Sequence, residues 1–121
     1  MNIILVGLGS MAGGILRYLI TFNLNSKVTE KEIPWGTFVV NFIGCFIIGL
    51  IFSLQQKNLI NHQVYLLLTT GILGGFTTFS TFSLETVSLI KAGLWQIAIM
   101  NIAFTLMSCL LGTIAGIYLA R

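Results

Sequence analysis

Charged side chains are scarce in this sequence of 121 residues. They make up 7% of it, whereas 56% of the residues are hydrophobic and the mean hydropathy is +0.99. The lysines and arginines form no basic run of the kind that binds nucleic acid. The G-x-x-x-x-G-K-[ST] loop that cradles nucleotide phosphates is also missing. These absences argue against a soluble domain, a nucleic-acid partner and transport driven by ATP.

Cysteine is almost as scarce. Cys45 and Cys109 are the sequence's two cysteines, too few for the disulfide framework of a secreted domain. Both fall near the middle of apolar stretches, where we interpret them as buried packing residues. His62 is expected to be a solvated loop residue, because no other residue accompanies it at metal-ligand spacing.

Long apolar runs, by contrast, fill the chain. A membrane-spanning helix needs roughly 20 mostly apolar residues, and four such stretches fit, at residues 3–22, 35–54, 64–90 and 94–120. We therefore predict that residues 1–121 form one all-α, multi-pass domain in the lipid bilayer of the cell membrane. A cleavable signal peptide does not fit, because Met1-Asn2 carries no basic side chain and the first run is of spanning length.

Positive charge is nearly balanced between the two sides of this predicted bundle. The basic side chains divide into Arg17, Lys27, Lys31 and Lys91 on one side and Lys57 and Arg121 on the other. Since an excess of basic residues sets orientation, the sequence fits insertion both ways, or in one orientation opposite a related partner. Four short helices leave little room for an enclosed conduit, so we expect the chain to associate.

Residues 74–83, GGFTTFSTFS, place two glycines and five hydroxyl side chains inside the third apolar run. Hydrocarbon tolerates irregular or polar backbone only where it is buried in protein or lines a watery cavity. Broken spanning helices of this kind form ion and substrate sites. We therefore expect a broken third helix that lines a path for a small polar species. Phe79 and Phe82 share a face there; such a pair packs or faces lipid, or offers its positive ring edges to an anion.

Three further polar side chains lie within the predicted helices. Arg17 either snorkels to the interface or lines a vestibule that attracts anions. Glu85 either is exposed at the interface or stands near the mouth of the pathway, where it hydrogen-bonds or exchanges protons. Asn41 lies deep in the second helix and must find partners, either in a neighbouring helix or in a passing anion that its NH₂ group binds.

Asn101, Thr105 and Ser108 form a polar stripe on the fourth helix, since they are spaced three to four residues apart. Such side chains more often tie helices together than conduct. We interpret the stripe as support for the pathway.

Three motifs together resemble those of the CrcB/Fluc family of small fluoride channels. They are the glycine-rich run ending in Arg-Tyr at residues 9–18, the run from Gly36 through Asn41 to Gly44, and residues 74–83 followed by Glu85. The resemblance implies an antiparallel dual-topology dimer with two pores, formed with an identical chain or with a paralogous subunit. It also implies passive, fluoride-selective export that protects the cell, with no enzymatic activity.

The resemblance implies roles for individual residues as well. Phe79 and Phe82 would line the fluoride path, with Asn41 as its amide and Ser80 and Thr81 as its polar track. On the fourth helix the match is less direct, because Asn101 and Phe104 depart from the family's polar aromatic pattern. Thr105 and Ser108 would line the path from that helix.

A structural Na⁺ at the dimer centre is implied by the same resemblance. The backbone carbonyls of Gly74 and Thr77 from both subunits would hold it. Carbonyls freed by a helix break suit a hard cation, and a buried positive ion stabilises anions nearby.

Two other classes of protein remain as alternatives. A small multidrug-resistance transporter has a similar length, but it needs a membrane-embedded carboxylate, and the only charge in the first helix is Arg17. The second alternative, a structural subunit without transport of its own, would not explain the hydroxyl groups clustered in residues 74–83.

Overall fold

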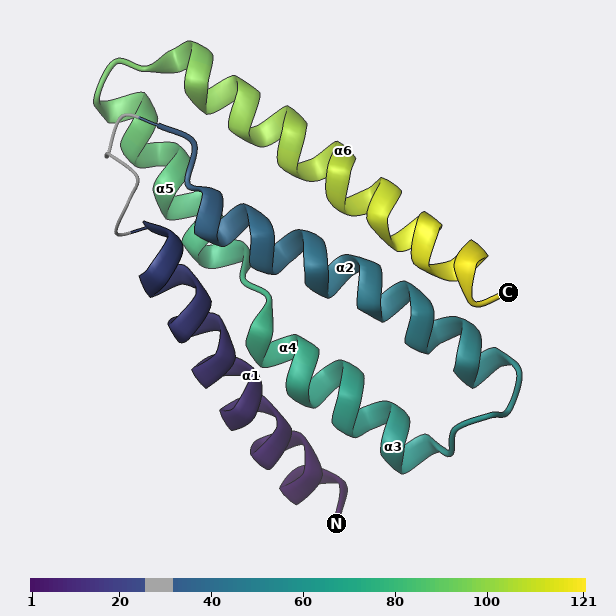
Figure 1. Ribbon diagram of the computed structural model, residues 1–121. Helices are drawn as coiled ribbons and strands as arrows, with labels where there is room; N and C mark the ends of the chain where they lie inside the picture. The colour runs from purple at the N-terminus through teal and green to yellow at the C-terminus, as the bar shows by residue number, and fades with distance from the viewer. Residues whose placement is uncertain (26–31) are drawn as a thin grey trace.

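The computed structural model describes residues 1–25 and 32–121, which fold into helices connected by short turns (Figure 1). In chain order the helices are α1 (Asn2–Asn25), α2 (Trp35–Gln56), α3 (His62–Leu66), the π-helix η1 (Leu67–Leu73), α4 (Gly74–Phe76), α5 (Phe79–Lys91) and α6 (Trp95–Leu119). The part of the chain that the structure describes contains no strand. Lys27 and Lys31, two of the basic residues expected on one side of the membrane, lie outside the described residues.

Four stretches of the described chain are long and apolar enough to cross a membrane: Asn2–Asn25, Trp35–Gln56, His62–Lys91 and Trp95–Leu119. The first two helices continue to Asn25 and Gln56, beyond the expected ends at Phe22 and Leu54. Polar residues extend a spanning helix because the headgroup region adds thickness beyond the hydrocarbon core.

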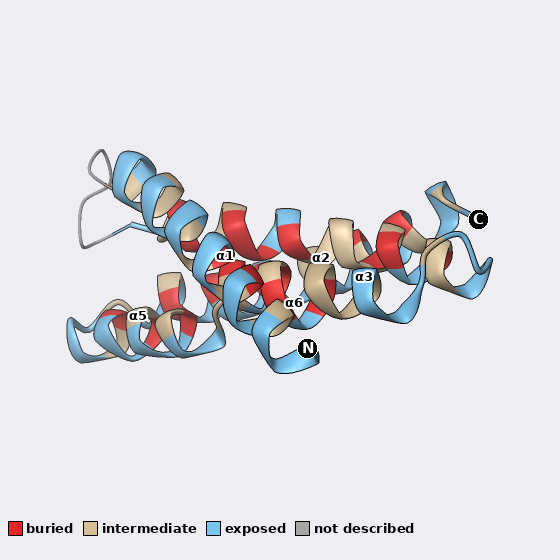
Figure 2. Cartoon of the chain, turned by 90° about the horizontal axis from the view of Figure 1, so that it is seen from below, coloured by how far each residue is buried: buried red, intermediate tan, exposed pale blue. Residues whose placement is uncertain are grey.

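Helix α2 forms the centre of the bundle. Figure 1 shows α6 along one side of α2 and α1 with α3 and α4 along the other. Helix α2 packs most extensively on α6, and α1 packs on η1 and α4. In the most apolar 18-residue window of each span, 39% of the window is buried in α2 but only 11% in α1. The exposed residues in Figure 2 lie along the outward faces of the helices, where lipid or a second subunit would cover them.

The backbones of α2 and α6 approach each other closely at Gly49 and Gly116. A Cβ atom on Gly116 would collide with the carbonyl oxygen of Phe46, and one on Gly49 with the carbonyl oxygen of Thr113. The hydroxyl of Thr113 also donates to the carbonyl of Cys45 at 3.0 Å. Small residues at a crossing of membrane helices permit this approach and the dispersion contacts that come with it.

The third span changes its helix type along its length. After α3 it widens into η1, in which hydrogen bonds join residues five apart, and it returns to α-helical geometry in α4. Helix α4 ends at Phe76, and α5 begins at Phe79. The hydroxyl of Thr78 caps α5 by accepting a hydrogen bond from the backbone N–H of Thr81 at 3.2 Å.

Candidate functional site

Thr77 and Thr78 separate α4 from α5 in the middle of the third span. The backbone angles are φ −86° and ψ 157° at Thr77 and φ −150° and ψ 122° at Thr78, so both residues are extended. An extended segment cannot continue the helical hydrogen bonds. It leaves N–H and C=O groups that need other partners away from water.

Asn41 on α2 is the partner of Thr78. Its Nδ2 atom donates to the carbonyl of Thr78 at 3.0 Å, and the N–H of Thr78 donates to Asn41 Oδ1 at 2.8 Å. The Asn41 side chain is buried, with 9% of its surface exposed. A side-chain amide carries two N–H donors, so the second can serve a different acceptor.

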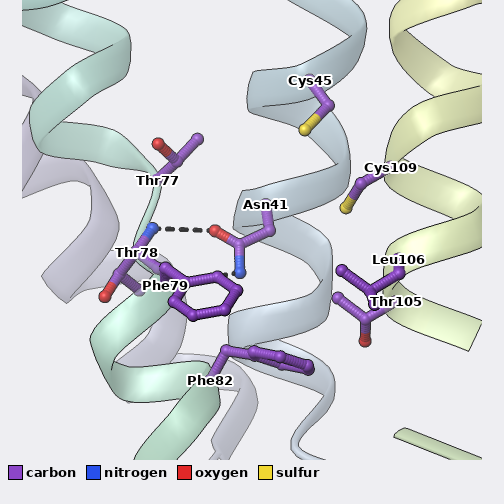
Figure 3. A pocket seen from close by; sticks show the side chains of 9 residues that line it. All are labelled: Asn41, Cys45, Thr77, Thr78, Phe79, Phe82, Thr105, Leu106 and Cys109. Carbon is purple, nitrogen blue, oxygen red and sulfur yellow. Dashed lines mark hydrogen bonds between the residues drawn. The ribbon is translucent and has the colours of Figure 1, made fainter. Parts of the chain in front are cut away.

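A pocket of ≈ 190 Å³ lies beside Thr77 and Thr78 (Figure 3). Its lining comes from α2, the extended residues, α5 and α6: Asn41, Cys45, Thr77, Thr78, Phe79, Phe82, Thr105, Leu106 and Cys109. A water molecule occupies about 30 Å³ in the liquid. The pocket therefore has room for a small ion with a few waters and not for a drug-sized ligand.

Phe79 and Phe82 both line this pocket, with ring centroids 5.5 Å apart and ring planes at 49°. They differ in burial. Phe82 is packed inside the chain with 7% of its surface exposed, whereas Phe79 is 73% exposed. A large aromatic ring left this open on a membrane protein faces lipid or another subunit.

Ser80, Thr81 and Ser108 are not among the residues that line the pocket. Ser80 is exposed and Thr81 is half-buried in the first turn of α5. The hydroxyl-bearing residues that line the pocket are Thr77 and Thr78, which directly precede that helix, and Thr105 on α6. Because a new helix begins at Phe79, the directions of its side chains depend on the backbone angles of the two extended residues before it, Thr77 and Thr78.

Three pocket residues outside residues 74–83 were not expected from the sequence: Cys45, Leu106 and Cys109. A signal for two of them was present. Cys45 follows Asn41 by four residues, and Cys109 follows Thr105 by four. Residues four apart lie on the same helix face, so the faces that were expected to line the path include both thiols.

Thr37, Asn41 and Cys45 form one face of α2, since each follows the last by four residues. We call it the α2 polar face. Thr37 Oγ1 donates to Glu85 Oε1 at 2.7 Å, one turn from the Asn41 contact. The other carboxylate oxygen, Oε2, is buried and has no hydrogen-bond partner among the described residues. Glu85 is half-buried and does not line the pocket.

Arg17 is also half-buried and lies outside the pocket lining. Its Nε atom donates to the carbonyl of Gly75 at 3.1 Å. This bond ties α1 to α4 just before the extended residues. The guanidinium thus satisfies a backbone carbonyl close to the point where regular helical bonding ends.

The backbone carbonyls of Gly74 and Thr77 lose their usual helical donors at the same point. In a continuous helix the N–H groups of Thr78 and Thr81 would serve them. Here the Thr78 N–H donates to Asn41, and the Thr81 N–H donates to the hydroxyl of Thr78. The freed oxygens are of the kind that a hard cation accepts.

Helix α6 is fixed to α5 by a buried chain of polar groups. Asn101 Nδ2 donates to Thr86 Oγ1 at 3.0 Å, and Thr105 Oγ1 donates to Asn101 Oδ1 at 3.3 Å. Asn101 is 1% exposed, so its role is to hold the helices together. Phe104 lies outside the pocket and stacks on Phe38, with ring centroids 4.8 Å apart.

Four apolar spans, three of which line a small pocket with amide, hydroxyl and aromatic groups, define a multi-pass integral membrane protein with a polar site inside its helices. Residues 4–117 match the family described as CrcB-like protein, Camphor Resistance (CrcB), and the chain belongs to this family.

Several relatives carry the name "Fluoride-specific ion channel FluC". The protein from Phocaeicola vulgatus is 40% identical over 120 residues, which cover 99% of this chain and 98% of that protein. The protein from Ruminiclostridium cellulolyticum is 42% identical over 121 residues, covering 99% and 92%. The protein from Clostridium novyi is 45% identical over 114 residues, covering 93% and 88%.

Proposed function

We propose that this protein is a fluoride-selective channel that lets fluoride leave the cytoplasm passively. The observation that carries the proposal is the near-full-length similarity to relatives named as fluoride-specific ion channels. Neutral HF crosses lipid and ionises in a less acidic cytoplasm, so fluoride accumulates there. A membrane potential of 100 mV is worth about 2.3 kcal/mol per charge, which sustains a roughly 50-fold concentration difference.

The composition of the pocket supports passive conduction of an anion. Its nine lining residues include no carboxylate, and Glu85 is bonded to Thr37 instead. Exchange of protons for cationic substrates would need an acidic side chain in the site. The lining offers an amide, hydroxyls and aromatic rings, which suit a small anion better.

In this proposal the second N–H of Asn41 donates to fluoride, while the first holds the carbonyl of Thr78. The positive edges of the Phe79 and Phe82 rings contribute a weaker attraction. Hydrogen bonds to an ion are roughly twice as strong as bonds between neutral groups. A few well-placed donors therefore offset part of the ion's lost hydration, and they favour fluoride because it is the strongest hydrogen-bond acceptor among the halides.

Thr105 contributes a hydroxyl that is already engaged. It donates to Asn101 Oδ1, so its hydrogen is not free for an anion. It can donate to fluoride only after its hydroxyl turns away from Asn101. Ser80, Thr81 and Ser108 belong to this proposal as residues farther along the path, and Arg17 and Glu85 as groups near its ends.

The test of the proposed function is fluoride efflux from liposomes that contain only this polypeptide. Valinomycin with a potassium gradient would supply the counter-current, and a fluoride electrode would measure the release. We expect rapid release that depends on valinomycin and leaves chloride inside. Release that requires a proton gradient, or equal release of chloride, would reject a fluoride channel.

We further propose that two chains associate in antiparallel orientation and that Na⁺ binds between them. The exposure of Phe79 and the open apolar faces of α1 and α6 support a second subunit. The freed carbonyls of Gly74 and Thr77 suit the cation, and two copies would double the number of oxygen ligands. Its positive charge would stabilise an anion nearby.

Replacing Na⁺ with N-methylglucamine tests the cation and the association together. We expect the dimer to dissociate at a lower detergent or denaturant concentration without Na⁺, as measured by cross-linking or light scattering. A monomer in both buffers that nevertheless conducts would contradict the dimer. A monomer that conducts only with a paralogous chain would identify a heterodimer.

A further inference from the structure

Helices α2 and α6 bring Cys45 and Cys109 together at the wall of the pocket. These are the chain's two cysteines, and both are free and half-buried. Both line the pocket, and the Thr113 hydroxyl lies within hydrogen-bond distance of both backbone carbonyls, 3.0 Å from that of Cys45 and 3.2 Å from that of Cys109. Figure 3 shows Cys109 projecting from α6 toward α2, on which Cys45 lies. The pair is thus accessible from a cavity and is preassembled by the packing of two helices.

We propose that the Cys45–Cys109 pair binds a soft metal cation that accepts two sulfur ligands, such as copper(I), silver(I) or mercury(II). Thiolate sulfur is a soft ligand and selects soft cations. Within the described residues there is no group of three or more His, Cys, Asp or Glu side chains that could hold a metal ion. Zinc needs about four such ligands, so the site fits ions that are satisfied by two.

The geometry requires little rearrangement. A metal–sulfur bond is roughly 2.3 Å long, so one ion between two sulfurs in a line separates them by about 4.6 Å. Because Thr113 holds the backbones of both cysteines close together, side-chain rotations can bring the two sulfurs to this separation. The close approach of α2 and α6 at Gly49 and Gly116 fixes the crossing that places the two cysteines on facing helices.

The binding step is an exchange of protons for metal without oxidation or reduction. Each thiol gives up its proton, and each sulfur forms one bond to the ion, so that two protons are released. The product with mercury(II) is neutral, and the products with copper(I) and silver(I) carry one negative charge. Either product would occupy the cavity that Asn41 and Phe82 also line and would hinder an anion there.

A titration with mercury(II) nitrate tests the binding itself. The protein would be reduced, freed of reductant and titrated while near-ultraviolet absorbance follows the sulfur–mercury bonds and a thiol reagent counts unreacted cysteine. We expect one ion per chain to consume both thiols. Two ions per chain, each on one thiol, would overturn the proposal.

Single and double variants supply the matched controls. Cys45→Ser and Cys109→Ser each leave one thiol, and we expect a monothiol competitor to remove mercury from them at a concentration at least 10-fold lower than from the parent chain. Equal retention would contradict a shared site. The double serine and double alanine variants contain no thiol and should bind none; use of both keeps the control valid if one fails to fold.

Fluoride release from liposomes then tests the consequence, which rests on the proposed function. We expect mercury(II) to slow release at least 10-fold in the parent chain and to leave the cysteine-free variants unaffected. Binding with unchanged release would overturn the obstruction of the path. A protein that releases no fluoride without metal would reject the proposed function, and the titration would still decide whether the thiols bind.

Discussion

Asn41 holds both backbone polar atoms of Thr78, accepting a hydrogen bond from its N–H at 2.8 Å and donating one to its carbonyl at 3.0 Å. One side chain thereby replaces helical partners that the extended residues lack. Only a group with a donor and an acceptor side by side can make both bonds. The shape of the third span and the chemistry of the pocket therefore depend on the same amide.

Changing Asn41→Asp would keep the acceptor for the Thr78 N–H and remove the donor for its carbonyl. It would also place negative charge in the pocket. Loss of one hydrogen bond to an ion costs about 1.5–3 kcal/mol, which corresponds to a roughly 10- to 150-fold lower fluoride flux. Flux from liposomes measures the effect, with elution of the purified variant as the check on folding. Full conduction would assign Asn41 a purely structural role.

Changing Phe79→Ile or Phe82→Ile removes an aromatic ring edge from the pocket. An aromatic contribution of about 0.5–1.5 kcal/mol corresponds to a roughly 2- to 10-fold loss of flux. Phe52→Ile is a matched control, because Phe52 also lies in a spanning helix and is not part of the pocket lining. An equal loss in all the variants, or none, would reject a lining role for the rings.

Changing Arg17→Lys would keep the positive charge and lose the Nε donor to Gly75. We expect this variant to lose about 1–3 kcal/mol of unfolding free energy, because lysine has a carbon where Arg17 has Nε, and Arg17→Gln to lose less, because its Nε2 stands at that position and can donate to Gly75. Denaturation in detergent measures the loss. If the lysine variant were as stable as the parent and only the glutamine variant failed, charge would be the important property, as for a vestibule.

Changing Gly116→Ala would push the added methyl group into the carbonyl of Phe46 and separate α6 from α2. Overpacking of this kind costs about 1–3 kcal/mol, and we expect lower stability together with lower flux. Gly7→Ala provides the control, because a Cβ atom there meets nothing within 4 Å. Similar behaviour of the two variants would show that the close approach is dispensable.

The existence of the spans could be predicted from composition, because hydrocarbon leaves few alternatives to long apolar helices. Which side of each span packs on its neighbours could not be predicted. The second helix is apolar nearly all around, so its sequence gives no periodic signal for the side that packs on α6. The meeting of Cys45 and Cys109 at one pocket depends on that packing, and both residues were interpreted only as buried packing residues.

Within the site, the resemblance to the CrcB/Fluc family implied that Asn41, Phe79, Phe82 and Thr105 line one path, and all four line the pocket. Neither the resemblance nor the spacing singled out Thr77 and Thr78 as lining residues of the path. The π-helix η1 shifts the phase of the side chains that follow it, and the extended residues shift it again. Neither change leaves a pattern in the sequence from which the final directions could be calculated.

The three residues of the α2 polar face lie on successive turns of one helix and have different roles. Thr37 binds a carboxylate, Asn41 binds the interrupted backbone, and Cys45 presents a thiol to the pocket. Each residue added to a helix turns it by about 100°. A single insertion between Thr37 and Cys45 would therefore rotate the residues after it by about 100° relative to those before it, and one of the three contacts would no longer lie on the same face as the other two. Substitutions can alter these roles separately, but all three depend on the length of this segment. Natural variants should therefore preserve the number of residues between Thr37 and Cys45 even where the residue identities change.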